Sequence, residues 1–129
     1  MLVYNYGYEY IVYLVLVLHP IHIIIAYRSN YMLCFIFNIC LMISSINYWK
    51  NPIYNSSRRY IDIIIAVSNI IYHISICNTF LQKMFFIVGT MMYPINTLFC
   101  IYDKIYFSIF FHMLLHILIS LSAIYLYLT

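Results

Sequence analysis

The sequence predicts an all-α fold, a polytopic bundle of about five transmembrane helices in a single domain, residues 1–129. Composition is the first reason. Of the side chains, 67% are hydrophobic and only 7% are charged, too few polar groups to cover a water-soluble domain. Length is the second reason, because the apolar runs each approach the roughly 20 residues that cross a bilayer as a helix. The composition therefore excludes a soluble globular domain.

The first two helices are expected over residues 8–27 and 31–48. The first run carries Glu9 where a signal peptide has basic residues, so we interpret it as a retained helix. Pro20 lies inside it, which a membrane helix tolerates with a bend. If this run does not span the membrane, four helices remain. The second helix ends at Pro52, because the residue before a proline disfavours helical geometry.

The remaining helices follow the one large polar segment, residues 49–59, which we call the polar island. Its serines are suited to cap the third helix, predicted over residues 59–81. A turn at Gln82-Lys83 precedes the fourth helix, residues 84–101, and a turn at Asp103-Lys104 precedes the fifth, residues 105–128. These short turns leave no room for a second domain.

The distribution of basic residues predicts an orientation. One side of the membrane carries Lys50, Arg58, Arg59 and Lys104, and the other carries Arg28 and Lys83. The positive-inside rule places the N-terminus and the polar island on the cytoplasmic or matrix side and the C-terminus opposite. The net charge of +3, spread over short loops, indicates orientation and not nucleic-acid binding. The expected partners are lipids and other membrane subunits or further copies of the chain.

Two predicted helices carry polar residues at helical spacing. One face of the third helix presents Asp62, Ala66, Asn69 and His73, and one face of the fifth presents Ser108, His112, His116 and Ser120. An ionisable group in mid-bilayer costs about 2.5–3.5 kcal/mol for Asp, Lys or Arg on insertion scales. Both faces are therefore expected to point into the bundle.

A structural interpretation of these residues stays open. Asp62 then pairs with Arg58 or Arg59, and the histidines of the fifth helix hydrogen-bond to hydroxyl groups of neighbouring helices. His19 and His22 flank Pro20 and are then expected to donate hydrogen bonds that stabilise the kink.

A metal-binding interpretation stays open beside it. His112 and His116, four residues apart, lie on one helical face and can place two imidazoles on one metal ion. Counted from the polar island, His112 lies about seven residues deep, on the order of 10 Å at 1.5 Å per residue. Asp62 lies on the same side, and His73 lies at a depth similar to that of His116.

Ser45, then Asp62, then the late His-x-x-x-His of residues 112–116 resemble the superfamily of alkaline ceramidases and progestin/adipoQ receptors. The resemblance implies a seven-helix fold, zinc bound by His and Asp, and hydrolysis of lipid amides. It implies metal ligands at Asp62, His112 and His116 and a catalytic role for Ser45. Tyr48 and Trp49 stand where that pattern has a further histidine. The stretch from Ser45 to Asp62 also resembles small, uncharacterised membrane proteins of large DNA viruses.

Three functions follow from these observations. Small size favours a structural or interaction subunit of a membrane assembly. The alternative is a zinc-dependent intramembrane lipid hydrolase, in which Asp62, His112 and His116 hold zinc and Ser45 stabilises the developing oxyanion. The third is a haem-binding membrane anchor, with His73 and one of His112 or His116 as axial ligands. Convergence of these side chains favours a metal site, and separate positions favour the structural role.

Overall fold

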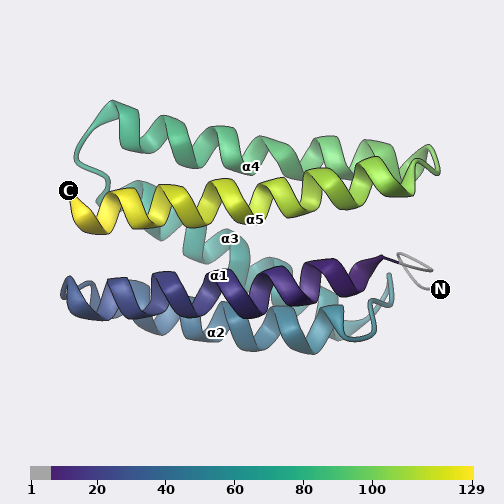
Figure 1. Ribbon diagram of the computed structural model, residues 1–129, viewed down its shortest axis with the longest axis horizontal. Coiled ribbons are helices and arrows are strands. Elements are labelled where there is room, and N and C mark those ends of the chain that lie inside the picture. Colours follow the sequence, from purple (N-terminus) through teal and green to yellow (C-terminus); the bar gives the residue numbers. More distant parts are fainter. Residues whose placement is uncertain (1–6) are drawn as a thin grey trace.

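A computed structural model describes residues 7–129 of the chain. Its helices are α1 (Tyr8–Arg28), α2 (Met32–Trp49), α3 (Ser57–Ile76), α4 (Phe80–Ile101) and α5 (Ile105–Leu128) (Figure 1). All five helices are long and apolar enough to cross a membrane. The predicted all-α transmembrane fold is therefore confirmed, and the chain is a small multi-pass membrane protein.

The helices pack in the spatial order α4, α5, α1, α2, α3, and the two outer helices of this series, α4 and α3, make few contacts with each other. α5 packs against both α4 and α1, α1 packs against α2, and α2 packs against α3. In Figure 1, α4 and α5 run side by side above α1 and α2, and α3 crosses behind. Although α3 and α4 are consecutive in the chain, they make few contacts with each other. The bundle is consequently open between these two helices.

Local capping explains where α3 and α4 begin, and it corrects one predicted boundary. The Ser56 hydroxyl accepts a hydrogen bond from the Arg59 backbone N–H and starts α3. The prediction extended this helix to residue 81, with a turn at Gln82-Lys83. In the structure α3 ends at Ile76, and Thr79 and Gln82 form a capping box that starts α4. This reciprocal bonding satisfies N–H groups at the start of the helix, so α4 begins four residues earlier than predicted.

The hydrophobic core consists of two clusters near opposite ends of the bundle. The island-end cluster contains Ile11, Val15, Tyr48, Trp49 and Ile109. The far-end cluster contains Ala26, Cys34, Cys77, Phe86, Ala123, Leu126 and Tyr127. Along α1 and α5, histidines separate the residues of one cluster from those of the other. A polar layer therefore crosses the middle of the bundle.

The polar faces of α3 and α5 point inward, as their helical spacing predicts. The side chains of Asn69 and His73 on α3 are buried, and so are those of Ser108, His112 and Ser120 on α5. Large aliphatic and aromatic side chains cover the outside of the bundle. This is the arrangement expected of helices that face lipid, because the bilayer offers no partner to a polar group.

Candidate functional site

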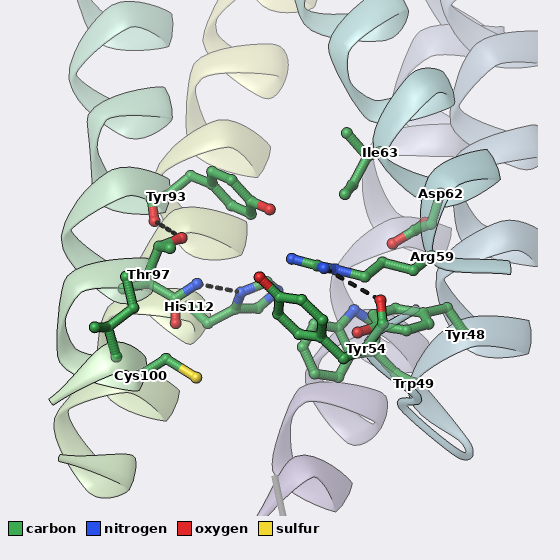
Figure 2. A pocket seen from close by; sticks show the side chains of 12 residues that line it. Tyr48, Trp49, Tyr54, Arg59, Asp62, Ile63, Tyr93, Thr97, Cys100 and His112 are labelled. Carbon is green, nitrogen blue, oxygen red and sulfur yellow. Dashed lines mark hydrogen bonds between the residues drawn. The ribbon is translucent and has the colours of Figure 1, made fainter. Parts of the chain in front are cut away.

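A cavity of about 80 Å³, which we call the island pocket, lies beside the polar island among α2, α3, α4 and α5. Its polar and aromatic lining includes Trp49, Tyr54, Arg59, Asp62, Tyr93 and His112 (Figure 2). Tyr54 and Tyr93 are exposed, so the pocket reaches the molecular surface. The site thus combines a cation, a carboxylate, an imidazole and several aromatic rings.

The carboxylate of Asp62 is held by two serines of α2. Its Oδ1 accepts hydrogen bonds from the hydroxyls of Ser44 at 2.8 Å and Ser45 at 2.7 Å. The expected partners Arg58 and Arg59 instead donate to backbone carbonyls. Asp62 therefore ties α3 to α2 and has a fixed orientation at the edge of the pocket.

Arg59 supplies the positive charge of the island pocket. Its Nη1 donates to the carbonyl of Tyr54 at 3.2 Å, and its guanidinium carbon lies 4.0 Å from the centre of the Tyr54 ring. The Tyr93 hydroxyl points toward the same guanidinium from α4 (Figure 2). Arg58 bonds the carbonyls of Asn47 and Asn51 and does not line the pocket. Neighbouring arginines therefore have different environments.

His112 is positioned from the opposite wall of the pocket. Its Nδ1 accepts a hydrogen bond from Nδ2 of Asn96 at 3.2 Å, and Oδ1 of Asn96 accepts one from the hydroxyl of Ser108 at 2.6 Å. The imidazole also meets the ring of Trp49 edge-on, with 4.5 Å between ring centres. Because Nδ1 accepts, the proton of the neutral ring is on Nε2.

The structure divides the predicted site residues between two cavities. Asp62 and His112 line the island pocket, whereas His73 and His116 line a second cavity of about 30 Å³ deeper in the bundle. Ser45 lines neither, since its hydroxyl is bonded to Asp62 and its side chain is only 2% exposed. Within residues 7–129, no three His, Cys, Asp or Glu side chains are arranged to hold a metal ion. As they lie, the predicted zinc ligands do not form one site.

The haem ligand predicted at His73 is engaged by hydrogen bonds at both ring nitrogens. Nδ1 lies 2.8 Å from the backbone oxygen of Asn69, to which it donates, and Nε2 accepts from the hydroxyl of Tyr127. An axial ligand needs a free nitrogen lone pair. In this arrangement neither ring nitrogen of His73 has a free lone pair for a haem iron.

Several residues of the island pocket are not among the site residues predicted from the sequence. Arg59 is expected from the sequence to set orientation and to contact lipid phosphates, whereas Tyr54, Tyr93 and Asn96 have no predicted role in a site. A usable signal did exist, because Tyr93, Asn96 and Cys100 recur at helical spacing on α4 and all three line the pocket. Sequence alone did not indicate that this face of α4 meets the polar end of α3.

An apolar groove lies between α3 and α4, farther from the polar island than the island pocket. This groove, of about 270 Å³, is lined by Val67, Ile70, Ile71 and Ile74 of α3 and by Ile87, Thr90 and Met91 of α4. Ile63 of the pocket precedes Val67 of the groove by one helical turn, about 5.4 Å along the axis. The polar pocket and the apolar groove therefore lie about one helical turn apart along α3.

No protein-family model matches the chain, and neither a curated protein nor a solved structure does. The resemblance to alkaline ceramidases and progestin/adipoQ receptors therefore depends on Ser45, Asp62, His112 and His116 alone and stays a prediction. Assignment of a function depends on the geometry of the two cavities and the groove.

Proposed function

We propose that this protein binds a membrane phospholipid in the opening between α3 and α4. The headgroup occupies the island pocket, and an acyl chain lies in the apolar groove. The observation that carries the proposal is the position of a charged, aromatic pocket about one helical turn along α3 from an aliphatic groove between α3 and α4. The polar pocket suits a lipid headgroup, and the apolar groove suits the acyl chain that follows the headgroup in a lipid.

Arg59 is the residue suited to the phosphate. A guanidinium presents five N–H donors in a planar fork that fits phosphate oxygens. In Arg59, the Tyr54 carbonyl accepts a hydrogen bond from Nη1 alone. The Tyr54 ring beneath it restricts its orientation. A headgroup phosphate at the membrane interface therefore finds a cation that is already positioned.

Asp62 and the surrounding aromatic rings favour a headgroup that also carries an amine. The Asp62 carboxylate lies at the same pocket, one helical turn from Arg59, with Oδ1 bonded by two serines. Trp49 and Tyr54 also line the pocket, and aromatic rings attract ammonium groups. We therefore expect the protein to prefer a zwitterionic phospholipid to an anionic one.

The aliphatic groove provides the second half of the binding site. Its residues Val67, Ile71, Ile87 and Met91 are exposed, so an acyl chain can enter sideways from the bilayer. Lipid chains are as apolar as these side chains, so van der Waals contact, not the hydrophobic effect, stabilises the chain there. The groove thus adds contact area, and the island pocket supplies selectivity.

The structural or interaction subunit predicted from size stays the second candidate. The same groove is of a kind that accepts a helix of a partner subunit, and the exposed aliphatic residues on both of its walls favour this role. A zinc-dependent lipid hydrolase would act on the same class of molecule, but only Asp62 and His112 of its predicted ligands share the pocket.

The test compares lipid retention by matched variants. The protein is purified in detergent, mixed with equal amounts of phosphatidylethanolamine and phosphatidylglycerol, and analysed by native mass spectrometry. Arg59→Gln is expected to weaken retention roughly ten- to a hundredfold, because a charge-assisted hydrogen bond contributes about 1.5–3 kcal/mol. Arg58→Gln is the control, since Arg58 has the same charge but does not line the pocket.

A second pair of variants tests the groove. Ile71→Trp fills it, whereas Ile64→Trp adds the same side chain at a residue of α3 outside it; Ile71 is 63% exposed and Ile64 is 64% exposed. Only Ile71→Trp is expected to reduce lipid retention. Equal retention by all four variants would refute the lipid proposal. Loss of a co-purifying protein or of an oligomer with Ile71→Trp, while lipid retention is unchanged, would instead support the interaction subunit.

A further inference from the structure

The second cavity, which we call the central cavity, contains an unusual group of polar atoms without partners. It has a volume of about 30 Å³ and lies in the polar layer between the two hydrophobic clusters. His19 and His22 of α1, Asn69 of α3 and His116 of α5 all line it. The buried atoms without a hydrogen-bond partner are His19 Nδ1, both ring nitrogens of His22, Asn69 Oδ1 and His116 Nε2.

This result corrects the interpretation of His19 and His22 as donors that stabilise the kink at Pro20. Neither ring nitrogen of His22 has a partner, and Nδ1 of His19 has none. Pro20 lies inside α1, and these two rings turn instead toward each other, with 4.8 Å between their centres. The ring centres of His19 and His116 lie 5.8 Å apart, so α1 and α5 present their imidazoles to one space.

Asn38 and His73 line the same cavity and are hydrogen-bonded, which sets them apart from these four residues. Asn38 bonds both Asn69 and Tyr127, and both nitrogens of His73 have partners. A buried polar group without a partner is strongly unfavourable, and the hydrocarbon around a membrane protein supplies none. The fold can thus satisfy polar groups at this depth, and the remaining ones require an occupant.

The unpartnered atoms define what the occupant must do. Asn69 donates its Nδ2 to Asn38, so its free Oδ1 is an acceptor. Nδ1 of His19 also has no partner, and a nitrogen of a neutral imidazole is either a donor or an acceptor. A neutral His22 has one donor nitrogen and one acceptor nitrogen. The occupant must therefore both donate and accept hydrogen bonds.

Volume selects among such occupants. A water molecule needs about 10–15 Å³ of this kind of space, so the cavity has room for about two waters. An organic ligand does not fit. The described side chains include no group of three that is arranged to hold a metal ion. Water meets the requirements of size and of donor and acceptor capacity together.

We propose that the central cavity binds water that joins His19 and His22 of α1, Asn69 of α3 and His116 of α5 into a hydrated proton-exchange centre. The centre has a connection to the surface through α5. The ring of His116 lies 5.1 Å from that of His112, and His112 lines the island pocket. Protons of the central imidazoles therefore exchange with solvent by way of this pair.

Solid-state NMR of the full-length protein in lipid bilayers tests the proposal. The histidines are labelled with ¹⁵N, and magnetisation is transferred from water protons to the ring nitrogens. We expect early water cross-peaks for His19, His22 and His116. His73 is the internal control, because its nitrogens are bonded to Asn69 and Tyr127, and its cross-peak is expected to be several-fold weaker.

A variant tests whether the same water contacts His19, His22 and His116. His22→Leu removes one ligand and adds an apolar side chain, and it is expected to reduce the water cross-peaks of both His19 and His116. Ile21→Leu, at the preceding and exposed position of α1, is expected to leave both unchanged. If His22→Leu does not fold, the proposal is still tested in the wild-type protein, by comparing the water cross-peaks of His19, His22 and His116 with that of His73.

Two results would overturn the proposal. Water cross-peaks at His19, His22 and His116 no stronger than that at His73 would show that the cavity is dry. The second result is that the purified protein contains one equivalent of a transition metal and that chelation shifts the ¹⁵N signals of these three histidines. A metal ion, and not water, would then satisfy their ring nitrogens.

Discussion

The hydroxyl of Tyr127 accepts a hydrogen bond from Nδ2 of Asn38 at 2.9 Å, although 89 residues separate the two in the sequence. The same hydroxyl bonds Nε2 of His73, whose Nδ1 donates to the backbone of Asn69. Asn69 closes the circuit by donating its Nδ2 to Oδ1 of Asn38 at 3.1 Å. α2, α3 and α5 are therefore joined by one closed ring of hydrogen bonds next to the central cavity.

Tyr127→Phe is expected to lower the free energy of unfolding by about 1 kcal/mol. It removes one hydroxyl and leaves the Asn38 amide and the His73 ring without their partner. Steric trapping in lipid bilayers measures this change. Tyr125→Phe is the control on the same helix, because Tyr125 is 37% exposed and lies outside the ring of hydrogen bonds. Equal effects of the two substitutions would contradict a structural role for the circuit.

Gly89→Val is expected to separate α4 from α5. A Cβ atom at Gly89 would lie 2.9 Å from Cδ1 of Ile119 and 3.3 Å from Cβ of Leu118. Overpacking of this kind costs about 1–3 kcal/mol of unfolding free energy. Ile119→Ala makes room, so the double variant should be more stable than the sum of the single changes predicts. Strictly additive effects in this double-mutant cycle would show that Gly89 is not a point of close approach.

Substitution of Ser44 and Ser45 is expected to be non-additive. Either serine still bonds Oδ1 of Asp62 when the other is replaced by alanine, whereas the double variant leaves that oxygen with neither donor. We expect the double variant to lose roughly 1 kcal/mol more stability than the two single variants together. In an Asp62→Ala background this excess should disappear. An excess that persists there would mean that the serines act through another group.

The polar island and the C-terminus are expected on opposite sides of the membrane. The basic residues Lys50, Arg58 and Arg59 favour the cytoplasmic or matrix side for the island, and three helices lie between it and the C-terminus. A reporter that is active only outside the cytoplasm, fused after Thr129, should be active. A fusion within residues 53–56 serves as the control and should be inactive. The opposite result for both fusions would reverse the orientation.

Much of the fold could be predicted because it depends on local properties. The apolar runs around Asp103-Lys104 predict where α4 ends and α5 begins, and the structure places them there. The boundary between α3 and α4 was misplaced. Hydropathy does not distinguish Thr79 and Gln82 from an ordinary polar turn, whereas their Thr-x-x-Gln spacing is that of a capping box and indicates the start of α4.

The candidate site was less predictable, and His112 and His116 illustrate why. Their spacing puts both imidazoles on the inward face of α5, as predicted. They nevertheless lie one helical turn apart, and His112 lines the island pocket whereas His116 lines the central cavity. The role of His19 and His22 depends on how α1 packs against α5, and residue spacing within one helix does not predict this packing.

The sequence by itself determined that this chain is an all-α membrane protein and indicated which faces of α3 and α5 point inward. Both follow from hydrophobicity and helical periodicity, which act within one segment. Only the tertiary structure decided that α3 and α4 stand apart, that Asp62 and His112 share one pocket, and that three helices bring unpartnered polar atoms to one cavity. The order of helices around a bundle depends on packing between segments far apart in the chain.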